Sequence, residues 1–591
     1  MRSFAASRTG WRVSTLMVAV TISSAPVLAL VTAGMLLADR HLSPWQTRAA
    51  LLVVGVTFTA TVGSHVAREI TGRLGALRPL AGAVGVASAT AVFAVHPFRL
   101  LQDGNSTAER LTWLLQLEDN ARFVGVAREM VSGSPSGASL AEMFGTGFVA
   151  PALLLLRAAA PDRLAGDPRT AAIDVVNLSA ALAILMTGVL VLLGLWSAGS
   201  DRPPRPKRLR VPLDAVVGAA LAAAAITVTV VIPMQVGFLS FVWGVVWLGL
   251  AALIGGTFLN AARTSRPMAT LVSAALLASA ILMIGSWPFL IAGLVPLTLG
   301  FLPAPNRLIR RMRRRPVVST LSVVVTVALA AMVIWSSPIR TVLTAYGIDA
   351  LTVGGSLITT PPAIRTIAIL ATLGVMLMPL FPPPLSSSLR HVLRSPGMAS
   401  VAVGLSMLAL WLAAAVLTGG QLGYAGPKLL HGFTAVAFVV ALPAVAGAAL
   451  DVRSPATAGV AAATTTILAF GVIDERLDDW ADFARADEQP HSRAMQVALQ
   501  GTDPDVPIRC LPAPGRPVTD GARWATYFCV NWAEDAFNDG RFHGYRSAIL
   551  DVRDDTFEPL VERILEERAT EYTFAYRLVA GAGWAGWNGQ S

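Results

Sequence analysis

An acidic pair, Glu118 and Asp119, followed by Asn120 and then Arg122, is the group of residues in this chain best suited to chemistry. It lies in a long polar segment, residues 96–173, between two apolar stretches. A carboxylate beside a substrate hydroxyl can accept its proton as a general base, provided that burial tunes its pKa. Arg122 follows the two acidic residues at helical spacing, which keeps a carboxylate ionised. The same spacing also fits a solvated, salt-bridged helix face without a catalytic role.

The composition indicates that this segment belongs to a polytopic membrane protein. Of the 591 residues, 54% are apolar and 14% are charged, and the mean hydropathy is +0.61. A membrane-spanning helix needs roughly 20 mainly apolar residues. By this criterion we predict about thirteen spans, at residues 14–37, 48–66, 79–95, 174–196, 212–234, 236–260, 268–286, 288–303, 317–336, 366–382, 397–418, 430–450 and 457–473.

Arginine clusters give the predicted orientation, because short cytoplasmic loops accumulate positive charge. The clusters lie at residues 68–78, 202–210, 307–315 and 390–394. All four are on the same side of the membrane if the apolar stretch 147–160 does not cross it. That stretch is short and contains Pro151 and Arg157, so we interpret it as a re-entrant or interfacial helix. The prediction is a multi-pass plasma-membrane protein with a cytoplasmic N-terminus and an extracytoplasmic segment 96–173.

The last part of the chain has a different character from the membrane domain, residues 1–473. Residues 474–591 contain 21 acidic and 12 basic residues, a net charge of −9. We predict that they form a small extracytoplasmic α/β domain. The predicted fold class is therefore an all-α polytopic membrane protein with a C-terminal α/β domain. Its two cysteines, Cys510 and Cys529, are the only ones in the chain. Outside the cytoplasm they favour one disulfide, although two separate buried thiols also fit the pattern.

Further polar residues on the predicted outer face are candidates for substrate binding. Arg binds a phosphate with two parallel hydrogen bonds, and Lys binds it as a point charge. The same residue types also anchor helix ends at lipid headgroups. Together with Asn120 and Arg122, the candidates are His96, Arg99, Arg340, Lys428 and His431.

In its acidic pair and its architecture, the chain resembles the GT-C superfamily of membrane glycosyltransferases. Within that superfamily it is most similar to the polyprenyl-phosphate-sugar-dependent arabinofuranosyl- and mannosyltransferases of actinobacterial envelopes. The resemblance rests on Glu118-Asp119-Asn120, many spans, an early external loop and an external C-terminal domain. It implies that Asp119 is the base that activates an acceptor hydroxyl, and that Glu118 serves the substrate or a divalent metal. It also implies a polyprenyl-phosphate-linked sugar as donor and an envelope glycan as acceptor, with inversion at the anomeric carbon.

Three other functions remain open from the sequence. A transporter or flippase is expected to carry ionisable residues inside its spans, and the predicted spans contain few. A polymerase of lipid-linked envelope glycans would have similar external loops, and a non-catalytic assembly protein would use the tail for binding. Nucleic-acid binding is not expected, because basic loops facing anionic lipid explain the pI near 10.4.

Overall fold

The computed structural model describes a helical bundle and one β-hairpin. The residues described are 77–101, most of 123–131, 146–165, 168–197, 210–235, 237–264, 266–294, 296–297, 360–377, 396–420, 422–423, 425–450, parts of 460–473, 575–580 and 583–588. In this part of the chain the longer helices are α3 (Leu77–Arg99), α7 (Thr146–Ala159), α9 (Pro168–Ser197), α10 (Arg210–Ile226), α12 (Leu239–Thr264), α13 (Arg266–Ile284), α18 (Pro362–Leu377), α20 (Pro396–Leu417) and α21 (Ala425–Val436).

The described helices have the length and composition of a membrane protein. Five are long and apolar enough to span a bilayer, at Thr170–Leu195, Leu213–Met234, Leu239–Gly256, Ala399–Leu417 and Ala425–Gly447. Several helices also expose large apolar side chains, such as Leu412 and Val416 of α20 at 59% and 74%. Water disfavours such a surface and lipid accepts it. These features support the predicted membrane environment. The predicted spans 14–37, 48–66 and 317–336 lie outside the described residues, so the total of thirteen stays a prediction.

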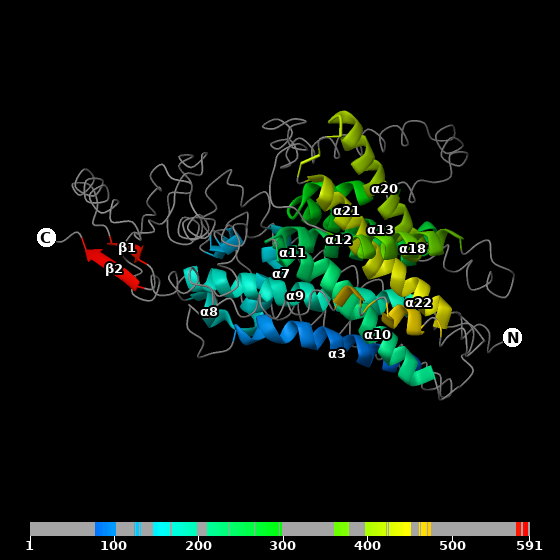
Figure 1. Cartoon of the computed structure of the whole chain (residues 1–591), viewed down its shortest axis with the longest axis horizontal. Helices are drawn as coiled ribbons and strands as arrows, with labels where there is room; N and C mark the ends of the chain where they lie inside the picture. The colour runs from blue at the N-terminus through cyan, green and yellow to red at the C-terminus, as the bar shows by residue number, and fades with distance from the viewer. Residues whose placement is uncertain are drawn as a thin grey trace.

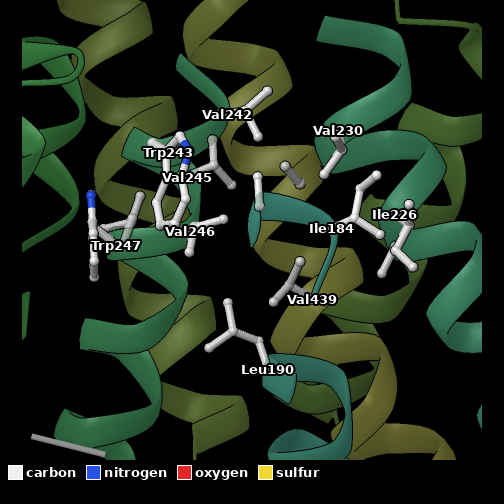
Figure 2. Packing of buried hydrophobic residues seen from close by; sticks show 14 of the residues in the cluster. Ile184, Leu190, Ile226, Val230, Val242, Trp243, Val245, Val246, Trp247 and Val439 are labelled. Carbon is white, nitrogen blue, oxygen red and sulfur yellow. The ribbon is translucent and has the colours of Figure 1, made fainter. Parts of the chain in front are cut away.

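The bundle is held together by a continuous apolar core. In Figure 2, Ile184 and Leu190 of α9 and Val439 lie between the side chains of α12 on one side and Ile226 on the other. The helices approach closely where residues are small: a Cβ placed on Gly249 of α12 would lie 3.2 Å from Leu190 and 3.4 Å from Val439. Close packing of this kind replaces the hydrophobic effect as the main stabilising force between helices in lipid.

Helices α3 and α10 form the tightest helix pair of this core. Together with α9 they lie side by side along one edge of the bundle (Figure 1). A Cβ on Gly85 would overlap the backbone of Ala215, and a Cβ on Gly218 would lie 2.6 Å from the carbonyl oxygen of Gly82. Glycine is required here because the two backbones are nearly in contact.

Two candidate spans are interrupted by π-helical segments, each followed by a proline. The first, η2 (Thr227–Val231), joins α10 to the short α11 (Ile232–Met234), in which Pro233 is the second residue. The second, η6 (Ala437–Ala441), joins α21 to α22 (Leu442–Leu450), in which Pro443 is again second. Proline has no backbone N–H, so a carbonyl one turn earlier loses its partner in each span.

The predicted span 288–303 differs from a regular helix in its described part. Its first residues form a seven-residue 3₁₀-helix, η3 (Pro288–Leu294). The chain nevertheless follows α12, because a Cβ on Gly244 would lie 2.6 Å from Leu290 and one on Gly255 would lie 2.9 Å from Leu297. Pro296 and Leu297 are described as α-helical again. Proline fits the first turn of a helix, where its missing N–H has no partner in the helix.

The predicted C-terminal domain is described only at its end. Strands β1 (Ala575–Ala580) and β2 (Gly583–Asn588) form an antiparallel hairpin in which Tyr576 pairs with Trp587 and Val579 pairs with Trp584. Because side chains alternate between faces along a strand, the two tryptophan positions belong to opposite faces of the hairpin. The predicted disulfide between Cys510 and Cys529 lies outside the described residues, as does the rest of the domain.

Candidate functional site

Only part of the predicted substrate site falls within the described residues. Glu118, Asp119, Asn120, Arg122 and Arg340 lie outside them. His96 and Arg99 belong to the last turn of α3, and their side chains are likewise not described. Lys428 and His431 are described in full, and they identify a polar cluster inside the apolar core.

The structure shows how deeply Lys428 and His431 are buried. The sequence assigns them to the outer-face connection near the start of the predicted span 430–450, and in the structure both lie in the first two turns of α21, at 5% and 0% exposure. They are three residues apart, so they share one helix face. That face is turned toward the connection between α11 and α12 and toward the start of α18.

Both ring nitrogens of His431 are hydrogen-bonded within the protein. Nε2 lies 2.7 Å from the carbonyl oxygen of Val228 in η2, and Nδ1 lies 2.8 Å from Oγ1 of Thr360 just before α18. A carbonyl oxygen can only accept, so Nε2 carries the proton. In the neutral ring Nδ1 then accepts the hydrogen bond from the Thr360 hydroxyl. The imidazole thus joins three segments that are far apart in the sequence.

Lys428, on the same helix face as this histidine, contacts one aromatic ring. Its Nζ lies 3.4 Å from the ring centroid of Phe238, a cation–π contact. Phe238 is the residue before α12, and its backbone N–H donates to the carbonyl oxygen of Pro233 at 2.9 Å. Phe241, one turn later, packs against the ring of His431 at 5.9 Å and against Trp287 at 5.1 Å.

This cluster joins helix ends that are predicted to lie on the same side of the membrane. Phe238 follows α11, Thr360 precedes α18, and Lys428 and His431 begin α21. The arginine clusters predict that all three ends are extracytoplasmic. The cluster is therefore a candidate site near the outer surface.

Helix α7, the predicted re-entrant or interfacial element, is inserted among the neighbouring helices. Its 14 residues span about 21 Å at 1.5 Å per residue, which is less than a bilayer core. Pro151 cannot donate to the carbonyl of Gly147, and Nε1 of Trp247 in α12 donates to that oxygen instead, at 3.0 Å.

A serine of α9 forms the second polar connection of α7. Oγ of Ser179 donates to the carbonyl oxygen of Phe148 at 2.8 Å, and Nε1 of Trp243 in α12 donates to Oγ of Ser179 at 2.8 Å. The ring of Phe148 in turn meets that of Phe123 edge to face, at 5.0 Å between centroids. The chain that follows the acidic pair is therefore anchored on α7.

An ion pair fixes the end of the same segment to α9. Nη1 of Arg163, in the short helix α8 (Pro161–Ala165), lies 3.2 Å from Oδ2 of Asp174, whose side chain is only 2% exposed. A buried carboxylate needs a partner of opposite charge. Among the described residues, no three His, Cys, Asp or Glu side chains converge as metal ligands.

Comparison with known proteins gives no relative: no protein-family model, no curated protein and no solved structure matches the chain. Function therefore has to be argued from the site itself. Sequence reasoning missed three of its members, Val228, Phe238 and Thr360. The signals available were the proline shortly after Val228 and the Thr360-Pro361-Pro362 helix start, yet neither indicates contact with α21.

Proposed function

We propose that this protein is a membrane glycosyltransferase that moves a sugar from a polyprenyl-phosphate donor to a cell-envelope glycan or lipid acceptor on the outer face of the membrane. The observation that supports it best is the ammonium group of Lys428, buried where three predicted outer helix ends meet. A buried lysine in a membrane protein is costly and indicates a functional site. A phosphate group attached to a lipid is an anion that reaches this depth, and Lys binds phosphate as a point charge.

The anchoring of Phe123, which follows the acidic pair in the sequence, also supports the proposal. Asp119 precedes Phe123 by four residues, and four extended residues span at most about 14 Å. Phe123 packs on Phe148 of α7, and α7 is hydrogen-bonded to α12. The same helix α12 begins next to Phe238, the residue that contacts Lys428.

The chemistry assigned to these residues is a single displacement. The carboxylate of Asp119 accepts the proton of the acceptor hydroxyl while the hydroxyl oxygen bonds to the anomeric carbon. The bond from that carbon to the lipid phosphate breaks, and the phosphate leaves with the electron pair. Lys428 stabilises the charge that develops on the phosphate, and Glu118 orients the substrate or holds a divalent metal.

Replacement of the proposed base tests this function. We expect Asp119→Asn to lower sugar transfer from a radiolabelled polyprenyl-phosphate sugar pool by roughly 100-fold or more, because removal of a general base costs about that much. Asp103→Asn, in the same segment, is the matched control and should retain transfer. Equal transfer by wild type and Asp119→Asn, at equal expression and thermal stability, would exclude the assigned role.

The lipid phosphate contact has a separate test. Lys207 and Lys428 are the only lysines of the chain, so Lys207→Arg leaves Lys428 as its one side-chain amine. We expect vesicles containing polyprenyl phosphate to protect Lys428 from acylation, whereas vesicles with the uncharged polyprenol should not. Lys428→Met should raise the KM for the donor roughly tenfold or more, because a hydrogen bond to a charged group is worth about 1.5–3 kcal/mol. Equal acylation in both vesicles would contradict the phosphate contact.

Transport or flipping of a lipid-linked glycan is the second candidate. It is favoured by buried ionisable residues within candidate spans, namely Asp174, Asp214, Lys428 and His431. In the described spans none of them lies deeper than His431, the seventh residue of its span, so each lies in the first third of its span and not at its middle. Movement of a fluorescent polyprenyl-phosphate sugar across proteoliposome membranes, without transfer to an acceptor, would support this candidate.

A further inference from the structure

We propose that the imidazole of His431 replaces the backbone N–H that Pro233 lacks, and that this bond makes His431 a positioning residue for Lys428. The structural part of the inference stands by itself. Its consequence for substrate rests on the proposed function, in which Lys428 contacts the lipid phosphate.

The hydrogen-bond register of η2, continued one residue further, provides no backbone N–H for the carbonyl of Val228. The N–H of Ile232 donates to the carbonyl oxygen of Thr227, five residues earlier. The next bond in this register would run from residue 233 to the carbonyl of Val228, but residue 233 is proline. Nε2 of His431 lies 2.7 Å from that oxygen. A buried carbonyl without a hydrogen-bond partner destabilises the folded protein, and the histidine removes this penalty.

Helix α21 contacts the chain on both sides of Pro233. On the preceding side His431 binds Val228, and on the following side Lys428 covers the ring of Phe238. Phe238 is itself joined to Pro233, because its N–H donates to the proline carbonyl at 2.9 Å. The two contacts of α21 are therefore linked through the segment 228–238, and we expect loss of the first to weaken the second.

The position of the imidazole is fixed by its remaining neighbours. Thr360 binds Nδ1 at 2.8 Å, and the ring of Phe241 packs against one side. A histidine that only filled space in the core would have no dependence on the residue at position 233. If the effect of replacing His431 depends on the residue at position 233, the histidine has the positioning role and does not only fill space.

The test is a double-mutant cycle in the full-length protein, in a Lys207→Arg background. The variants are His431→Leu, His431→Gln, Pro233→Ala, and Pro233→Ala combined with His431→Leu. The two measurements are Tm in nanodiscs and the acylation rate of Lys428, and neither of them requires a substrate. Glutamine retains an N–H donor near the position of Nε2, while an alanine in place of Pro233 supplies the missing backbone N–H.

We expect His431→Leu to lower Tm by several degrees and to raise Lys428 acylation at least fivefold. Both effects should fall by half or more in the Pro233→Ala background, and His431→Gln should stay near wild type. The matched control is Thr434→Val on α21, whose buried hydroxyl binds its own helix at Leu430. This variant should combine additively with Pro233→Ala.

Additive effects of His431→Leu and Pro233→Ala would overturn the inference, as would unchanged Lys428 acylation in a destabilised His431→Leu protein. A failure of the proposed function gives a different result. In that case the coupling between positions 233 and 431 is present, but polyprenyl phosphate does not protect Lys428.

Discussion

In the described part of the chain, two buried ring N–H groups bind backbone carbonyls for which a later proline provides no N–H. Trp247 binds Gly147, four residues before Pro151, and His431 binds Val228, five residues before Pro233. In lipid there is no water to bind such a carbonyl, so a side chain has to do so. The polar residues of the core are thus partly explained by its prolines.

The hydrogen bond from Trp247 to the Gly147 carbonyl can be tested by mutation. Trp247→Phe should lower the free energy of unfolding by about 1–3 kcal/mol, because the Gly147 carbonyl loses its donor while the aromatic ring is kept. Pro151→Ala should reduce that loss, since residue 151 then donates to the same carbonyl. Thermal unfolding of the four combinations measures the coupling. A Trp247→Phe loss that is independent of residue 151 would assign the tryptophan a packing role only.

Residue chemistry was only partly predictable from the sequence. Lys428 and His431 were identified as candidates by type, but their burial was not, because polar residues at a predicted span end fit an exposed position equally well. The partners of His431 are 71 and 203 residues away in the chain. Contacts at such separations depend on how helices pack, and hydropathy does not contain that information.

At the scale of elements, five of the spans predicted from apolar length correspond to described helices that could cross a bilayer, and packing determined their details. The predicted span 174–196 corresponds to α9, and 397–418 corresponds to α20. The π-segments and η3 were missed, because hydropathy is insensitive to hydrogen-bond register. Prolines at 233, 296 and 443 mark all three places, so they were the available signal.

The close contact between α3 and α10 predicts that a larger residue at position 85 destabilises the protein. Gly85→Ala should destabilise the protein by about 1–3 kcal/mol or more, because its Cβ would overlap the backbone of Ala215, which has little room to move. Gly471→Ala is the matched control, since a Cβ there meets nothing within 4 Å. The yield of folded protein and Tm in nanodiscs are the measurements. A Gly85→Ala protein as stable as the control would mean that the two helices separate easily.

At the scale of the whole molecule, the proposed chemistry depends on sidedness. The predicted topology puts the basic clusters on one side of the membrane and the acidic residues 474–591 on the other, because the thirteen predicted spans are an odd number. The same topology predicts that Glu118 and Asp119 are outside, where the proposed donor is a lipid-linked sugar and not a nucleotide-linked one. The proposed function therefore requires the predicted orientation.

The native cysteines allow a direct test of this orientation. After mild reduction of intact cells, a membrane-impermeant maleimide should label Cys510 and Cys529, and without reduction it should label neither, because they are predicted to form a disulfide. Ser200→Cys in a background free of both native cysteines should react only after permeabilisation, since it precedes the basic cluster 202–210. Labelling of the tail only after permeabilisation would put the acidic pair, by the same topology, in the cytoplasm. A lipid-phosphate sugar on the outer face would then be out of its reach.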